Sequence, residues 1–154
     1  HQLSRGLGDV YKRQLLDTAV VCNLANGDIF FKTSSSEVQQ GKLFSDTYHP
    51  PHTTNHGEVG LFEKAYANPA LVAALDEEKL KFRSPGAIAL SLAYARSVNY
   101  VLFMGTFRIY DFAAGLALCE GLEVIVESDY VIESKDKKTI EKIVALIHKR
   151  ERQE

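Results

Sequence analysis

The chain has 154 residues, of which 45% are hydrophobic and 25% charged, and its formal net charge is −2. This length fits one domain of common size, and both fractions are ordinary for a globular protein. The small net charge gives no reason to expect a nucleic acid or an anionic membrane as a partner. No apolar run approaches the ~20 residues needed to cross a bilayer.

Cys22 and Cys119 are the only cysteines, and both lie in apolar runs. Their spacing fits neither a zinc motif nor a redox motif, so both are predicted to be buried, reduced thiols. Reduced thiols are typical of the cytoplasm, which is therefore the expected compartment.

The amino-terminal segment, residues 1–14, begins with His1 instead of Met and shows neither strand nor helix periodicity. Its stretch from Leu3 to Gln14 looks like a translated sequencing adapter, a tail seen on reading frames from short-read, metagenomic assemblies. An ordinary basic segment is the alternative. Because such tails are excluded from fold reasoning, we expect residues 1–14 to make few contacts with the rest.

The first elements predicted after this tail form a β-hairpin. Two β-rich runs, residues 18–24 and 28–32, flank Ala25-Asn26-Gly27, and Asn-Gly between such runs is a strong hairpin signal. A polar, Ser-rich stretch follows, and residues 41–44 are a candidate short strand.

Residues 45–60 are predicted to form a loop that contains His49, His52 and His56. Histidines at this spacing can bind zinc, but the two intervening prolines and the lack of a nearby cysteine argue against a prearranged site. An exposed loop near a cleft is the favoured interpretation.

The rest of the chain alternates helical and strand-like patterns. Ser84 is expected to cap the helix at residues 85–97, Asp111 the next one, and Asp136 or Ser134 the last. Such alternation predicts an α/β layered fold in which at least part of the sheet is parallel. The predicted helices are residues 59–67, 69–77, 85–97, 111–120 and 136–150, and the strands are 79–83, 99–104, 123–126 and 130–132.

The most informative motif is Tyr110-Asp111-Phe112-Ala113-Ala114-Gly115, which joins the apolar run 100–104 to a helical segment. Asp is a strong helix-start residue, because its carboxylate accepts hydrogen bonds from the first amides. In open α/β folds ligands bind beyond the carboxyl ends of strands, where a carboxylate can also hold Mg²⁺. Asp111 is thus either a simple cap or a metal ligand.

This motif follows Arg83-Ser84-Pro85-Gly86, and the ordered pair resembles the carboxy-terminal half of the inositol monophosphatase family. In that family an Arg/Gly-Ser-x-Gly segment starts one helix and an aromatic-Asp-x-Ala-Ala/Gly-Gly segment starts the next. The resemblance runs from about residue 19 to about residue 146. It implies an Mg²⁺-dependent phosphatase that hydrolyses a small phosphomonoester, such as an inositol or sugar phosphate, by metal-activated water.

The resemblance also implies roles for single residues. Asp111 would be one ligand of a site with two or three Mg²⁺ ions, and Ser84 with the amides of Gly86 and Ala87 would face the substrate phosphate. Family members often carry an acid shortly before the aromatic-Asp pair, whereas residues 103–110 contain Arg108 and no acid. Arg108 is either a reader of a second anionic group or a surface residue. Family members often form homodimers.

The family's Asp-Pro-x-Asp-Gly-Thr motif and an upstream Glu are absent from this sequence. We therefore expect residues 15–154 to be the carboxy-terminal portion of one domain, inactive as an isolated fragment. The alternative is a non-catalytic, degenerate family member that binds a phosphorylated ligand or a protein partner, and the missing acid near Arg108 is its support.

Overall fold

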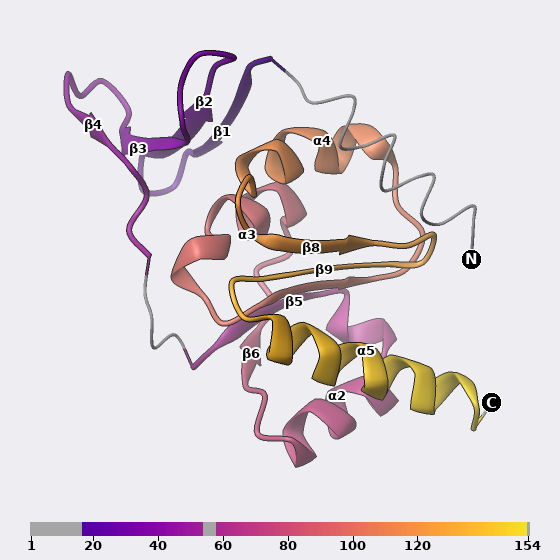
Figure 1. Ribbon diagram of the computed structural model, residues 1–154. Helices are drawn as coiled ribbons and strands as arrows, with labels where there is room; N and C mark the ends of the chain where they lie inside the picture. The colour runs from indigo at the N-terminus through magenta and orange to yellow at the C-terminus, as the bar shows by residue number, and fades with distance from the viewer. Residues whose placement is uncertain (1–16, 54–57, 154) are drawn as a thin grey trace.

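The computed structural model describes residues 17–53 and 58–153, which form two β-sheets with helices between and beside them (Figure 1). The adapter-like segment, residues 1–14, lies outside the described residues, as does His56. Within the described part of the chain, no helix is long and apolar enough to cross a membrane.

The first sheet is antiparallel and has four strands in the order β1-β2-β3-β4. The predicted hairpin is confirmed, since β1 pairs with β2 and Asn23 faces Asp28 across the turn. Gly27 has a φ of 77°, a backbone conformation that glycine adopts without strain. The strand expected at residues 41–44 begins two residues earlier. The bounds are β1 (Ala19–Asn23), β2 (Asp28–Lys32), β3 (Gln39–Lys42) and β4 (Tyr48–His49).

The second sheet is mixed and has five strands in the order β6-β5-β7-β9-β8. Strands β6, β5 and β7 are parallel, whereas β9 runs antiparallel to both β7 and β8. The predicted α/β fold with a partly parallel sheet is confirmed. The bounds are β5 (Gly60–Glu63), β6 (Phe82–Arg83), β7 (Val101–Met104), β8 (Glu123–Val126) and β9 (Tyr130–Ser134).

The helices form two layers (Figure 1). Helices α2 and α5 cover one face of the five-stranded sheet, and α3 and α4 lie between its other face and the four-stranded sheet. The α-helices are α2 (Pro69–Glu77), α3 (Ile88–Ala93), α4 (Ile109–Leu118) and α5 (Lys137–Glu151), with short 3₁₀ helices η1 (Ala65–Ala67) and η2 (Ala95–Ser97).

Three apolar clusters correspond to these layers. One joins α2 and α5 to the five-stranded sheet, and a second joins α3 and α4 to that sheet's other face. The third joins the same two helices to the four-stranded sheet. The largest fully buried side chains include Phe30, Phe62, Leu71, Tyr100, Phe112, Ile132 and Ile143.

Two predicted helices differ most from the observed ones in extent. Residues 60–63 form strand β5, and only 65–67 are helical, as 3₁₀. A short apolar strand that is buried on both faces cannot be told from a buried helix by its periodicity. Helix α3 begins at Ile88 with Ala87 as its N-cap, so the predicted capping role of Ser84 is wrong. By contrast, α5 begins as predicted, with Asp136 accepting a hydrogen bond from the Lys138 amide at 3.1 Å.

Both cysteines are free thiols, as predicted. Cys119 is buried, and burial raises the pKa of its thiol well above the ordinary value. Cys22 is only half-buried.

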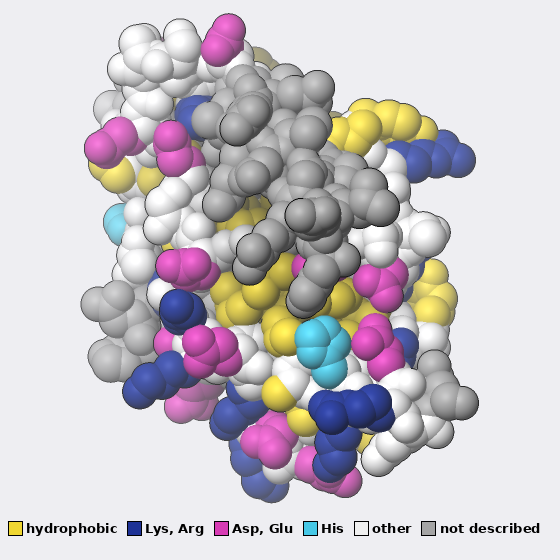
Figure 2. Space-filling model, turned by 45° about the vertical axis from the view of Figure 1, so that its right-hand side comes forward, with side chains coloured by type: hydrophobic (Ala, Val, Ile, Leu, Met, Phe, Trp, Pro, Cys, Tyr) yellow, Lys and Arg dark blue, Asp and Glu magenta, His cyan; other side chains and the backbone are white. Residues whose placement is uncertain are grey.

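On the face shown in Figure 2, acidic and basic side chains are interspersed around α5.

Gly115 lets α3 and α4 cross closely. A Cβ atom built on Gly115 would lie 2.8 Å from both Cβ and Cδ1 of Leu92 and 3.4 Å from the carbonyl oxygen of Ala89. Leu92 is fully buried, so it has little room to move. Gly115 thus serves the contact between α4 and α3.

We therefore expect Gly115→Ala to destabilise the protein. Alanine gains ~1 kcal/mol of helix propensity over glycine, and overpacking a filled core costs ~1–3 kcal/mol. The net loss should be ~1 kcal/mol in the free energy of unfolding, measured with urea. Ala145→Gly on the exposed face of α5 calibrates the propensity term alone. Greater stability of Gly115→Ala would show that Leu92 yields easily.

Glu133 is a buried carboxyl group on β9, at the end of the sheet opposite the carboxyl end of β7. It pairs with Val101 and is fully buried, and neither carboxylate oxygen has a hydrogen-bond partner among the described residues. Burial raises its pKa to about 8, although Arg96 and Lys135 act to lower it. The folded protein thus holds Glu133 protonated near neutral pH.

This buried group predicts a pH dependence of stability. Because the folded-state pKa of Glu133 is about 8 and its ordinary value is 4.5, its contribution is complete below pH 4.5 and is lost as pH rises toward 8. The slope attributable to this group is about 1.4 kcal/mol per pH unit. Urea unfolding between pH 5 and 8, at intervals of about one unit, should show that slope, and Glu133→Gln should flatten it. An equal slope in the variant would rule Glu133 out as its source.

Candidate functional site

The candidate site lies at the edge where the three parallel strands end. Since β6, β5 and β7 run parallel, their carboxyl ends meet at one edge of the sheet. The segments that leave these ends are residues 84–87 after β6, Lys64 after β5, and residues 105–111 after β7. The structure thus places Asp111 at the same edge as Ser84 and Gly86.

Asp111 lies in the first turn of α4 but does not cap it. The helix begins at Ile109, and Arg108 is the N-cap. Sequence reasoning placed the helix start two residues late, because Asp111 was taken to be the residue that starts the helix. The Asp111 side chain is exposed, and within the described residues its carboxylate has no hydrogen-bond or ion-pair partner. In the first turn, the helix dipole favours this negative charge.

The amides of Gly86 and Ala87 already have an anionic partner. The buried carboxylate of Glu63, at the end of β5, accepts hydrogen bonds from the Gly86 amide at 2.9 Å and from the Ala87 amide at 3.3 Å. It also accepts one from the Ser91 hydroxyl at 2.5 Å. A phosphate would therefore have to displace Glu63 to reach these two amides. Ser84 remains exposed beside them.

Arg108 is exposed at the end of the segment that leads from β7 into α4. Its Nη1 donates a hydrogen bond to the Tyr110 hydroxyl at 2.7 Å, and its guanidinium carbon lies 5.9 Å from the centre of that ring. Within the described residues it forms no ion pair with a carboxylate. Its positive charge is thus held at the surface near Asp111.

Lys64 is a site residue that sequence reasoning missed. It follows β5 directly and has a φ of 59°, which is uncommon for a residue other than glycine. Its Nζ lies 5.1 Å from the centre of the Phe103 ring. Because residues 59–67 were predicted to be one helix, no sequence signal placed Lys64 at the end of a strand.

The described residues fit only part of a metal site. They contain no group of three or more His, Cys, Asp or Glu side chains that could hold a metal ion. Mg²⁺ often takes only one or two protein carboxylates and completes its shell with water and substrate oxygens. Asp111 suits one such position, since its carboxylate is exposed and uncommitted among the described residues, whereas Glu63 is engaged.

Two of the three histidines considered as zinc ligands, His49 and His52, lie within the described residues. The rings of His49 and His52 have their centres 4.7 Å apart, and Nδ1 of His49 lies 2.8 Å from the carbonyl oxygen of Pro50. His56 lies outside the described residues, so a zinc role for the loop stays untested.

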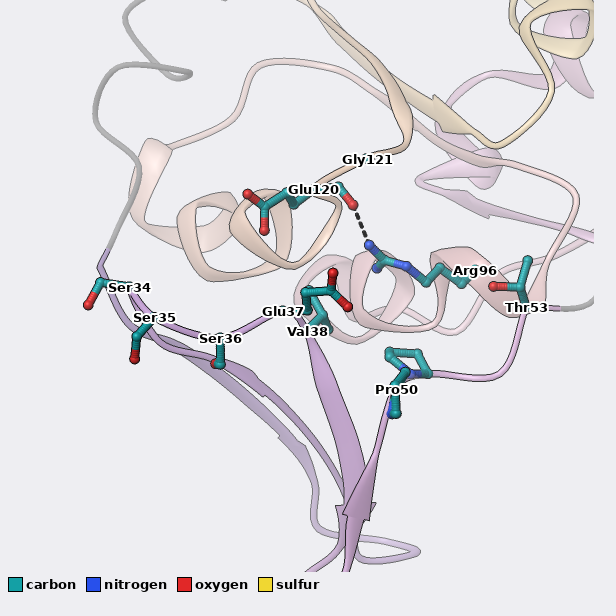
Figure 3. A pocket seen from close by; sticks show the side chains of 11 residues that line it. Ser34, Ser35, Ser36, Glu37, Val38, Pro50, Thr53, Arg96, Glu120 and Gly121 are labelled. Carbon is teal, nitrogen blue, oxygen red and sulfur yellow. Dashed lines mark hydrogen bonds between the residues drawn. The ribbon is translucent and has the colours of Figure 1, made fainter.

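A pocket of about 630 Å³ lies at the opposite end of α4 from Asp111, and sequence reasoning did not foresee it (Figure 3). Helix α4 has 10 residues, so ~15 Å separates its two ends. Arg96 closes one side of the pocket and donates hydrogen bonds to the carbonyl oxygens of Leu118 and Glu120. The pocket is lined by Ser34, Ser35, Ser36, Glu37, Val38, Pro50, Pro51, Thr53, Arg96, Glu120 and Gly121.

Known structures share this arrangement of two sheets and two helix layers. The chain superimposes on the Thermotoga maritima IMPase with a TM-score of 0.68 at 17% identity, covering 88% of this chain and 57% of that one. The chain has the inositol monophosphatase fold. The inositol monophosphatase from Anabaena gives a TM-score of 0.67 at 17% identity, covering 86% and 61%. Mycobacterium tuberculosis SuhB gives 0.66 at 16% identity, covering 86% and 58%.

The predicted resemblance to inositol monophosphatases is thus confirmed for the fold. At 16–17% sequence identity, the match shows the fold alone. The chain spans about three fifths of the length of the solved structures with which it shares this fold. No protein-family model and no curated protein sequence matches it.

We expect Glu63→Ala to destabilise the start of α3. The substitution leaves the amides of Gly86 and Ala87 and the Ser91 hydroxyl without their shared acceptor. Ser91 is buried, and an unpaired buried hydroxyl costs ~1–3 kcal/mol, whereas the more exposed amides can turn to water. Faster amide hydrogen exchange at Gly86 and Ala87 and a lower urea midpoint should follow. Glu141→Ala on the exposed face of α5 is the control. Unchanged exchange at both amides would contradict the anchoring role.

Proposed function

We propose that this chain supplies the carboxy-terminal part of the active site of an Mg²⁺-dependent phosphomonoesterase. The observation that most supports this proposal is the position of Asp111. Its exposed carboxylate lies in the first turn of α4 and has no partner among the described residues. Its place at the carboxyl edge of the parallel strands, within the inositol monophosphatase fold, supports this proposal.

In the proposed site Asp111 is one metal ligand. The bound metal would supply an activated water and neutralise phosphate charge. The Asp111 carboxylate lies in the first turn of α4, where the helix dipole favours a negative charge. Further carboxylates would come from an upstream part of a longer polypeptide, so residues 15–154 are proposed to be the carboxy-terminal portion of one domain and inactive alone. The covered share of the matched structures, 57–61% for the three described above, supports this.

The substrate is proposed to be a small phosphorylated molecule, such as an inositol or sugar phosphate. Ser84 is the freest of the proposed phosphate contacts, because its side chain is exposed at the edge. Gly86 and Ala87 contribute their amides only if Glu63 withdraws. A homodimer remains a prediction. A cytoplasmic setting is proposed from the two free thiols.

A non-catalytic protein that binds a phosphorylated ligand or a protein partner is the second candidate. The engagement of Glu63 favours it, because an internal carboxylate occupies the amides that would otherwise receive phosphate. A helix start that is satisfied by the protein's own anion gains less from an added phosphate.

The substitution Asp111→Asn tests the catalytic proposal. The 154-residue chain alone should release no phosphate from p-nitrophenyl phosphate in Mg²⁺. A longer polypeptide that carries the upstream carboxylates should do so, and Asp111→Asn should lower its kcat by ~100-fold or more, since even outer-shell changes cost metal enzymes 10–100-fold. Asparagine removes the charge but keeps the size of the side chain.

Asp136→Asn is the matched control, because Asp136 caps α5 far from the proposed metal. It should leave kcat unchanged. Equal kcat in wild type and Asp111→Asn would exclude Asp111 as a metal ligand, and a longer polypeptide without any turnover would favour the non-catalytic candidate.

A further inference from the structure

Two cations flank the segment that joins β7 to α4, and neither has an acidic partner among the described residues. Lys64 lies beside the first residue of this segment, Gly105, and Arg108 is its last residue. The ion pairs found in the described part of the chain all involve other residues. Asp111 is the only acid between residues 98 and 119.

The backbone around Lys64 holds its amine at this edge. On one side, Glu63 is fixed by its hydrogen bonds to the Gly86 and Ala87 amides and to Ser91. On the other side, Ala65 is buried and begins η1. The backbone of Lys64 is thus held between two fixed residues in a left-handed conformation, with a φ of 59°. Its side chain extends toward Phe103 on the neighbouring strand β7.

The Lys64 side chain lies along the end of β7. A Cβ built on Gly105 would lie 3.7 Å from Cδ and 3.9 Å from Nζ of Lys64, so the amine approaches the backbone there. Gly105 has a φ of 134°, which disfavours any side chain at this position. Beneath the amine, the Phe103 ring packs edge-on against both Phe107 and Phe112. An ammonium group over such an aromatic surface is partly shielded from water.

Arg108 brings the second charge within reach of a small ligand. Arg108 is three positions after Gly105 along the chain, so their Cα atoms are at most ~11 Å apart. The hydrogen bond from Arg108 to the Tyr110 hydroxyl limits the freedom of its guanidinium group. Guanidinium and ammonium groups both bind carboxylate and phosphate through charge-assisted hydrogen bonds.

We propose that Lys64 and Arg108 form a subsite that selects phosphate esters carrying a second anionic group. The inference rests on the proposed function, because it takes the phosphoryl group to lie near Asp111 on the same edge. The selected class comprises small bisphosphates and phosphorylated carboxylic acids, as opposed to neutral polyol phosphates.

The experiment compares two ligands that differ in one group, 3-phosphoglycerate and glycerol 3-phosphate. Their dissociation constants are measured by calorimetry on the 154-residue chain, without Mg²⁺ and at low ionic strength. The wild type should bind 3-phosphoglycerate about tenfold tighter, a ratio expected from one added charge-assisted contact. Lys64→Met should bring this ratio to about one, and Lys64→Arg should keep it.

Two further variants serve as controls for poor folding and for the loss of a lysine elsewhere. Lys64→Gly suits the left-handed backbone at this position, so it tests the loss of charge even if Lys64→Met folds poorly. Lys142→Met removes a lysine on α5 that is paired with Glu78, and it should behave as wild type. A wild-type ratio near one, or a tenfold ratio that persists in both Lys64→Met and Lys64→Gly, would overturn the subsite.

The two proposals fail in different ways. A ligand preference that depends on Lys64, together with a longer polypeptide whose turnover ignores Asp111→Asn, supports the subsite and removes the phosphatase mechanism. Turnover that depends on Asp111, together with equal binding of the two ligands, overturns the subsite and leaves the mechanism intact.

Discussion

The arrangement of the candidate site depends on the carboxylate of Glu63. This buried group ties the end of β5 to the start of α3 through the amides of Gly86 and Ala87 and the hydroxyl of Ser91. A buried carboxylate is stable only when several donors form hydrogen bonds with it. Loss of one of the three bonds therefore weakens the other two. Through them the first turn of α3, which packs on α4, is fixed relative to the strand edge beside Asp111 and Lys64.

Most of the architecture could be predicted from the sequence because its signals are local. Asn26-Gly27 specifies the hairpin, and the apolar face of α5 with its Asp136 cap specifies that helix. Strand β5 was missed for a physical reason. Phe62 and its neighbours are buried on both sides of the strand, so they show no alternation that would separate a strand from a helix.

The site was predicted less completely than the fold. A carboxylate beyond a buried strand is a recognisable pattern, and it led to Asp111. The positions of Glu63 and Lys64 followed from β5, so the error in that strand hid both. Nor could any local pattern reveal that Gly86 and Ala87 would donate to a side chain more than twenty residues away. Such long-range pairings arise from the order of strands in the sheet, which the sequence of one chain does not display.

Because of the buried carboxyl group of Glu133, the stability of the sheet depends on pH at a place remote from the candidate site. Glu133 lies opposite Val101, at the start of β7, whereas Asp111 follows the end of that strand. The loss of stability as pH rises toward 8 would weaken the packing of β7, β9 and α4 without touching the groups around Asp111. An alkaline decline in ligand binding or turnover would then report partial unfolding, and it would be accompanied by loss of protection in the sheet.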